Sequence, residues 1–178
     1  MRKWSILVIV LVLSACKNDV IFTSTHVMPN SKWTYADSLV FDFEIKDTSK
    51  VYALDLNVTH QDTFPYENLY IKVHSKYPNG IQKSDILSLE FADGSGQWMG
   101  KSSGSGYLAP IAFQPKAIFK IPGLYHMAIY QNSRKDTVGG IEKIELVIHQ
   151  LGSISAEKKE REQVRKSNEV QNRDSTKI

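Results

Sequence analysis

Apolar and polar residues alternate along most of the chain between residues 20 and 148. In residues 39–45, for example, Leu, Phe, Phe and Ile alternate with Val, Asp and Glu. A period of two places one row of side chains on a core and the other in water, which is typical of β-strands. The same pattern recurs at residues 52–58, 69–73 and 144–148, and residues 124–131, which follow a turn, are expected to form a further strand. The pattern therefore predicts successive strands with no amphipathic helix between them.

Short polar segments predict how these strands are connected. Residues 46–50 are few and polar, so the strands on either side of them should form a hairpin. Asn79-Gly80 follows the strand at 69–73, and Asn-Gly provides the positive φ angles that a tight turn requires. Residues 132–137 are expected to form another polar hairpin tip before the last strand.

The middle of the chain is less regular. Residues 101–106 (Lys-Ser-Ser-Gly-Ser-Gly) have no large apolar side chain, so we expect an exposed loop. Pro110 and Pro115 interrupt residues 107–119, and proline removes hydrogen-bond donors, which indicates an edge or irregular strand. About eight short strands without crossover helices predict an all-β fold, an antiparallel β-sandwich or jelly-roll-like single domain over residues 22–151.

The beginning of the chain has a different pattern. Two basic residues precede the apolar run 6–13, and Leu-Ser-Ala precedes Cys16. These features are typical of a secretory signal, whereas a spanning helix needs roughly 20 apolar residues. Leu-Ser-Ala-Cys resembles the lipobox of bacterial lipoproteins, in which the cysteine receives an S-diacylglycerol group and an N-acyl group. We therefore predict a signal peptide at 1–15, lipidation of Cys16, and a short linker within 16–21.

A chance cysteine beside an ordinary signal cleavage site, or a buried thiol, is the alternative to lipidation. Cys16 is the single cysteine of the chain, so an exported protein could form no internal disulfide with it. Lipidation explains why it is there. By analogy with lipoprotein sorting signals, Lys17 in place of Asp favours the outer membrane. The sequence leaves open whether the domain faces the periplasm or the cell surface.

Composition changes abruptly beyond Gly152. Residues 157–166 mix acidic and basic side chains, and between residues 157 and 177 only Val164 and Val170 offer apolar contact. Such a segment buries too little surface to offset its ordering entropy, so we expect residues 152–178 to be disordered or a frayed helix. A tail that docks on a partner is the alternative.

Charge and candidate chemistry narrow the function further. The net charge is +3, and Lys and Arg are spread along the chain, so no nucleic-acid partner is predicted. The five histidines lack the close spacing typical of zinc sites, and we predict no metal site or cofactor other than the covalent lipid. Gly104-Ser105-Gly106 lacks the frame of a nucleophile elbow. We therefore expect no catalytic residue and no enzymatic activity.

Aromatic residues are the remaining candidates for binding. Trp98, Trp33 and Tyr107 lie near strand ends, where exposed rings could stack on sugars or anchor a protein partner. Trp98 lies in a glycine-rich segment and is the first choice for an exposed ring. Packing in the core or at a sheet edge is the alternative for all three.

Several stretches carry a family resemblance. The lipobox, the β-domain, the Ile-Pro-Gly-Leu-Tyr run at 121–125 and the Gly-Gly-Ile-Glu-Lys-Ile-Glu-Leu run at 139–146 occur together. With residues 22–43 and the strand before the Pro-Asn-Gly turn, they resemble the GldH family of gliding-motility lipoproteins of Bacteroidota. The resemblance implies an outer-membrane lipoprotein that works with other lipoproteins and a type IX secretion machine in gliding. It carries over no catalytic residue.

Two function classes follow. In the first, the domain is a tethered interaction module whose partners are other envelope or gliding lipoproteins and secretion-machinery proteins, with the membrane contacted through the lipid anchor. In the second, it is a surface-exposed glycan-binding or accessory polysaccharide-utilisation lipoprotein.

Overall fold

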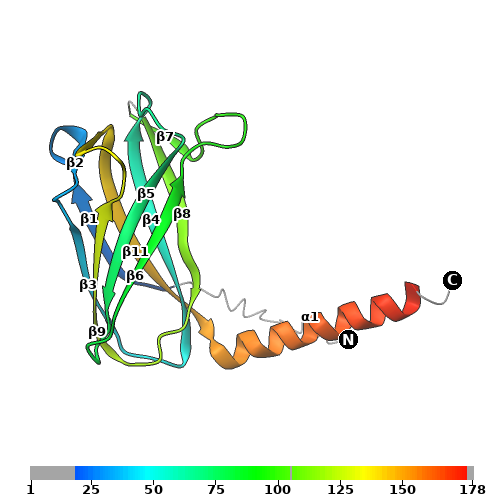
Figure 1. The fold of residues 1–178 in the computed structure, drawn as a ribbon. Coiled ribbons are helices and arrows are strands. Elements are labelled where there is room, and N and C mark those ends of the chain that lie inside the picture. Colours follow the sequence, from blue (N-terminus) through cyan, green and yellow to red (C-terminus); the bar gives the residue numbers. More distant parts are fainter. Residues whose placement is uncertain (1–18, 105, 176–178) are drawn as a thin grey trace, which may run out of the picture.

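Two antiparallel sheets pack face to face in the computed structural model, which describes residues 19–104 and 106–175 (Figure 1). The larger sheet has the order β1 (Asp19–Val27), β11 (Ile141–Ser153), β4 (Lys50–Gln61), β8 (Gly106–Ala117) and β7 (Lys101–Ser103). The smaller sheet has the order β3 (Leu39–Ile45), β9 (Gly123–Gln131), β5 (Asn68–Lys76) and β6 (Gln82–Glu90). The predicted all-β antiparallel sandwich is confirmed.

Two smaller elements flank the sheets. The turn η1 (Pro29–Ser31) leads into β2 (Lys32–Thr34), which pairs with β10 (Thr137–Gly139) in a two-stranded ribbon. The helix α1 (Ile154–Ser175) follows β11 directly and projects away from the sandwich (Figure 1). Of the two forms expected for the tail, the structure therefore has the helix.

The core lies between the two sheets and consists of the side chains that point inward from their strands. Phe41, Leu56, Ile71, Ile129 and Leu146 come from both sheets, and each is 0% exposed. Full burial of such a side chain stabilises the fold by roughly 1.5–3 kcal/mol. The rows that alternation assigned to the core are therefore confirmed.

The connection between β3 and β4 differs from the prediction. β3 pairs with β9, and β4 pairs with β11 and β8, so residues 46–49 cross from one sheet to the other. The predicted hairpin was wrong because a short polar segment between two one-sided strands suits either connection. Asp47 shapes this crossing: its carboxylate accepts hydrogen bonds from the Ser49 hydroxyl (2.6 Å) and amide (2.8 Å), and these bonds lower the pKa of Asp47.

The second predicted hairpin tip was wrong for the same reason. Residues 132–136 leave β9 in the smaller sheet and lead through β10 to β11 in the larger one. Gln131 is fully buried, and its side-chain amide donates to the Lys135 carbonyl at 2.8 Å, which fixes this crossing. By contrast, the Asn79-Gly80 turn joins β5 and β6 as predicted, with Gly80 at φ +82°.

The expected exposed loop at 101–106 is partly strand. Lys101–Ser103 forms the edge strand β7 against β8. Gly106 is buried, and a Cβ there would lie 1.9 Å from the His60 carbonyl oxygen, so this glycine allows β8 to approach β4. The irregular strand expected for 107–119 is confirmed, because β8 pairs with β4 through two register shifts.

The connections fall at two ends of the sandwich (Figure 1). The end we call the anchor end has residues 46–49, 77–81 and 118–122, the beginning of β1 and the beginning of α1. The end we call the distal end has residues 62–67 and 91–100 and the β2–β10 ribbon. The predicted signal peptide and Cys16 lie outside the described residues, and β1 already begins within the stretch 16–21.

Candidate interaction surfaces

Trp33 is not an exposed ring. It is 1% exposed within β2, and its indole N–H donates to the Asp37 carbonyl at 2.9 Å. The prediction of exposure is therefore corrected for this residue. The reason is long-range: β2 pairs with β10 at the distal end, which turns Trp33 into the core.

Trp98 and Tyr107 are brought together by the fold. Both are half-buried and pack on the ring of His60, with centroid distances of 4.8 Å for Trp98 and 5.9 Å for Tyr107. Phe64 and Phe91 pack on the same imidazole at 5.7 and 5.1 Å. We call these five residues the His60 cluster. Because Trp98 and Tyr107 are half-buried in this packing, they offer solvent only part of each ring.

Two buried polar atoms, one in the His60 ring and one in the neighbouring Thr59, have no hydrogen-bond partner among the described residues. His60 is 0% exposed, and its Nδ1–H donates to the Gln61 carbonyl at 2.9 Å. Its Nε2 atom and the neighbouring Thr59 hydroxyl have no hydrogen-bond partner among the described residues. Within residues 19–104 and 106–175, His, Cys, Asp and Glu side chains form no group of three that could hold a metal.

Exposed tyrosines gather elsewhere, on the outer side of the smaller sheet near the distal end. Tyr35, Tyr66 and Tyr70 are 59%, 38% and 51% exposed, and Tyr130 is half-buried beside them. We call these four residues the tyrosine face. Tyr70 and Tyr130 occupy polar positions of the alternating pattern, so their outward direction could have been predicted from the sequence.

Two hollows lie on the tyrosine face and share Asn132. The first, of about 380 Å³, is lined by Tyr35 and Tyr130 together with Lys72 and His74. The second, of about 520 Å³, is lined by Tyr66, Tyr70, Arg134 and Lys135. Neither lining contains Asp or Glu. The tyrosine face thus combines exposed rings with positive charge.

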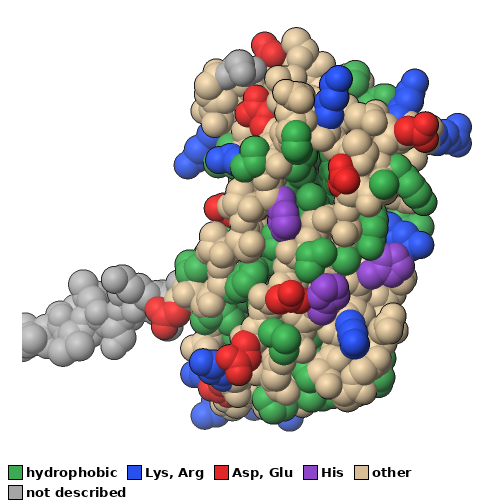
Figure 2. Space-filling model, turned by 90° about the vertical axis from the view of Figure 1, so that its left-hand side faces the viewer, with side chains coloured by type: hydrophobic (Ala, Val, Ile, Leu, Met, Phe, Trp, Pro, Cys, Tyr) green, Lys and Arg blue, Asp and Glu red, His purple; other side chains and the backbone are tan. Residues whose placement is uncertain are grey.

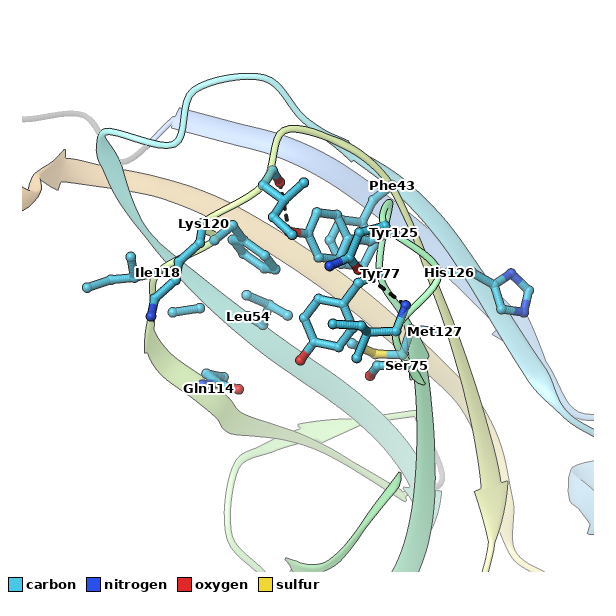
Figure 3. Close-up of a pocket in the computed structure, with 15 residues that line it drawn as sticks. Phe43, Leu54, Ser75, Tyr77, Gln114, Ile118, Lys120, Tyr125, His126 and Met127 are labelled. Atoms are coloured by element: carbon cyan, nitrogen blue, oxygen red, sulfur yellow. Dashed lines mark hydrogen bonds between the residues drawn. The ribbon is translucent and has the colours of Figure 1, made fainter. Parts of the chain in front are cut away.

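A different hollow lies at the anchor end, between the two sheets (Figure 3). Its volume is about 340 Å³. Tyr125 stacks on Phe43 at 5.6 Å and meets Phe119 edge-on at 4.8 Å, while its hydroxyl donates to the Ile121 carbonyl at 2.8 Å. Burial raises the pKa of Tyr125, so the hydroxyl stays protonated and keeps this bond. We call this hollow the anchor-end cavity.

The walls of the anchor-end cavity come from both sheets. Figure 3 shows Leu54, Gln114, Ile118 and Lys120 on one side and Tyr77, Ser75 and Met127 on the other, with His126 pointing away. The lining has two basic residues, Lys120 and His126. It contains no Asp or Glu. The cavity is therefore apolar, with a cation near its opening.

On the face that Figure 2 shows, charged side chains are more dispersed than the basic residues of the tyrosine face. Lys and Arg side chains lie at separate places there, near acidic side chains, and hydrophobic and histidine side chains lie between them. None of the helices among the described residues combines the length and the apolar composition that spanning a bilayer requires.

Comparison with known proteins gives consistent matches. A family model described as GldH lipoprotein matches residues 20–148. A Christiangramia forsetii protein, "Gliding motility lipoprotein GldH homolog", is 31% identical over 113 residues, covering 62% of this chain and 70% of the relative. The Flavobacterium johnsoniae "Gliding motility lipoprotein GldH" is 26% identical over 141 residues, covering 79% and 87%. The region that the family model matches begins in β1 and ends in β11, so it coincides with the sandwich and stops before α1.

Proposed function

Because the chain belongs to the GldH lipoprotein family, as its sequence predicts, we propose that it serves gliding motility as a non-catalytic interaction module anchored to the outer membrane. The S-diacylglycerol and N-acyl groups on Cys16 hold it there. Its partners are other envelope lipoproteins and proteins of the type IX secretion machinery. The names of the two relatives, which describe motility lipoproteins rather than enzymes, support this proposal.

The tyrosine face is the observation that carries the interaction role. Tyrosine and arginine are enriched among residues that dominate binding energy, because they combine a large apolar area with a polar group. Tyr35 and Tyr70 expose more than half of their surface, and Arg134 lies in the same hollow as Tyr70. Since neither hollow has an acidic residue, the complementary partner surface carries carboxylates beside apolar side chains.

Position also suits the tyrosine face to this role. The strand β5 begins beside Tyr70 at the distal end and finishes at Lys76 at the anchor end. At about 3.3 Å per residue, Tyr70 lies roughly 20 Å from the anchor end along this strand. A partner in the same envelope layer can therefore reach it without displacing lipid.

A crosslinking experiment tests this proposal. Tyr70→Ala removes an exposed ring, so we expect folding to persist while recovery of crosslinked envelope proteins falls about tenfold or more, as for a central interface tyrosine. Affinity purification from crosslinked membranes with quantitative mass spectrometry measures this. Val27→Ala removes another exposed apolar side chain, 73% exposed on β1, and serves as the control. Equal recovery from both variants would contradict the proposal.

Glycan binding is the second candidate, and the exposed rings of the tyrosine face favour it. Tyr70 lies with the Asn132 side chain in one hollow, and a ring beside an amide suits a sugar. Immobilised envelope polysaccharide provides the test. Binding that Tyr70→Ala abolishes would establish this candidate, whereas loss on Trp98→Ala alone would place the site at the His60 cluster.

A further inference from the structure

We propose that the anchor end faces the bilayer and that the anchor-end cavity accepts one acyl chain of an anionic membrane phospholipid. This inference rests on the proposed lipid anchor at Cys16. It adds a second, non-covalent contact with the membrane, made by the folded domain itself.

The first step is the position of the cavity relative to the anchor. Asp19 is three residues after Cys16, which span at most about 11 Å when extended. Asp19 pairs with Gln150, Gln150 with Tyr52, and Tyr52 with Ala117, which lines the cavity. Three strand spacings of about 4.8 Å place Ala117 roughly 14 Å from Asp19. The anchor therefore holds the opening of the cavity close to the membrane surface.

The second step is the surface around the cavity. Ile81 and Ile118 line it and are still 60% and 53% exposed, and Leu124 nearby is 62% exposed. These side chains have no covering element among the described residues. Apolar side chains enter the interfacial region of a bilayer while lysines beside them reach the headgroups, so this rim suits a membrane surface.

The third step is the choice of occupant. A cavity of about 340 Å³ lined by Phe43, Leu54 and Phe119 offers apolar contact to a hydrocarbon chain. Lys120 is exposed at the cavity, whose lining has no acidic residue to pair with it. The thioether, ester and amide groups of the chain's own anchor are uncharged, so they would leave Lys120 without a counter-charge. The phosphate of an anionic phospholipid supplies one.

Fluorescence quenching by brominated lipid tests the inference. Trp33 and Trp98 lie at the distal end. Trp98 packs on His60, which lies eight residues after Tyr52, the partner of Ala117, and so roughly 26 Å from the cavity along β4, and we expect neither native ring to approach lipid. Ile118→Trp places a reporter at the cavity, where the exposed position accepts a larger ring. In vesicles of phosphatidylglycerol with brominated acyl chains, we expect the introduced tryptophan to lose most of its emission and the two native ones to keep theirs.

Two forms of the Ile118→Trp protein separate the sources of the acyl chain. One is the lipidated mature protein, and the other is residues 16–178 with Cys16→Ser, which has no acyl chain of its own and lacks both Trp4 and the apolar run 6–13. We expect quenching in both. If only the Cys16→Ser form is quenched, an acyl chain of the protein's own anchor fills the cavity in the lipidated form. If only the lipidated form is quenched, the cavity itself has no affinity for lipid. Either result, or quenching in neither form, would overturn the inference.

Charge variants test the role of Lys120. Lys120→Gln should weaken binding of the Cys16→Ser chain to phosphatidylglycerol vesicles about fivefold, as expected for one lysine at an anionic surface. Lys46→Gln is the control, because Lys46 also lies at the anchor end but already pairs with Glu44 at 3.5 Å. Equal losses would indicate general surface attraction and refute a headgroup site at the cavity.

These results separate this inference from the proposed function. If mass spectrometry finds no acyl group on Cys16, the lipoprotein proposal fails, while the Cys16→Ser chain still decides whether the cavity binds lipid. If the reporter is not quenched but crosslinking through the tyrosine face succeeds, only the cavity inference fails.

Discussion

His60 at the distal end is enclosed by four aromatic rings and is 0% exposed, whereas Tyr125 at the anchor end packs on Phe43, Phe119 and Tyr77 beside an open cavity of about 340 Å³. The rings are similar in kind, but their packing differs. At the distal end, Gly106 lets two strands approach closely enough to close the cluster. At the anchor end, residues 118–122 arch between the sheets and leave space beneath them.

Aromatic content alone therefore does not identify a binding site. Rings that fill their own space stabilise the fold, while rings that border unfilled space lose contacts and can gain them from a ligand. The two ends should therefore respond differently to equivalent substitutions.

Phenylalanine truncation should give the largest difference between the ends. Phe91 is 0% exposed in the His60 cluster, so Phe91→Ala should lower the free energy of unfolding by about 3–5 kcal/mol. Phe119 is only half-buried beside the cavity, so Phe119→Ala should cost about 1–2 kcal/mol. Urea denaturation of the Cys16→Ser chain measures both. Equal losses would show that the two ends are packed alike.

A glycine substitution examines how the distal end closes. The Cβ of alanine at residue 106 would clash with the backbone of His60, so Gly106→Ala should lower the free energy of unfolding by about 3 kcal/mol. Gly152→Ala is the control near the anchor end, where an added Cβ meets nothing within 4 Å. We expect the control to change unfolding by less than about 0.5 kcal/mol. A tolerated Gly106→Ala would mean that close strand approach does not maintain the cluster.

The sequence was enough to predict which side chains face the core, but not which strands pair with each other. Alternation identified the inner positions Leu56 and Leu146, because it depends only on which side of a strand faces the core. Residues 46–50 and 132–137 were assigned to hairpins because a polar connection does not reveal whether its two strands share a sheet. That choice depends on long-range pairs such as Leu39 with Ile129.

The candidate surfaces were predictable in part. Tyr70 stands at an outward position of its strand, which alternation shows directly. Trp33 is buried because Val138, more than a hundred residues later, pairs with it. The anchor-end cavity joins Phe43, Leu54 and Tyr125, whose neighbourhood arises only from the packing of two sheets. Local sequence patterns contain no signal for such a space.

A buried hydroxyl group at the distal end offers a substitution that should stabilise the fold by a smaller amount. The Thr59 side chain is buried, and its hydroxyl has no partner among the described residues. Thr59→Val keeps the shape and removes the unpaired hydroxyl, so the free energy of unfolding should rise by about 1 kcal/mol. Thr25→Val is the control, because the Thr25 hydroxyl donates to Glu145 at 3.2 Å and its removal should bring no gain. Destabilisation by Thr59→Val in thermal unfolding would show that the hydroxyl has a partner in solution.

The smallest effect concerns the contact between α1 and the sandwich at the anchor end. The Glu157 carboxylate pairs with Lys116 at 2.6 Å and with Arg161 at 2.9 Å, and these hydrogen bonds lower the pKa of Glu157 below its ordinary 4.5. A lowered folded-state pKa means that the contact is complete above pH 4.5 and is lost as the pH falls through the lowered value.

Acidification should therefore release the beginning of α1 from β8 while the His60 cluster stays folded. Amide chemical shifts of Lys116 and Glu157 should follow one titration, which Glu157→Gln abolishes. Glu162→Gln is the matched control, because the Glu162 carboxylate pairs with Lys166 within the helix at 3.4 Å and should leave that titration unchanged. Because Lys116 is more than half exposed, solvent screens the pair, so global stability should hardly change. A titration that moves distal residues such as Trp98 together with Lys116 would show that the two ends are coupled rather than independent.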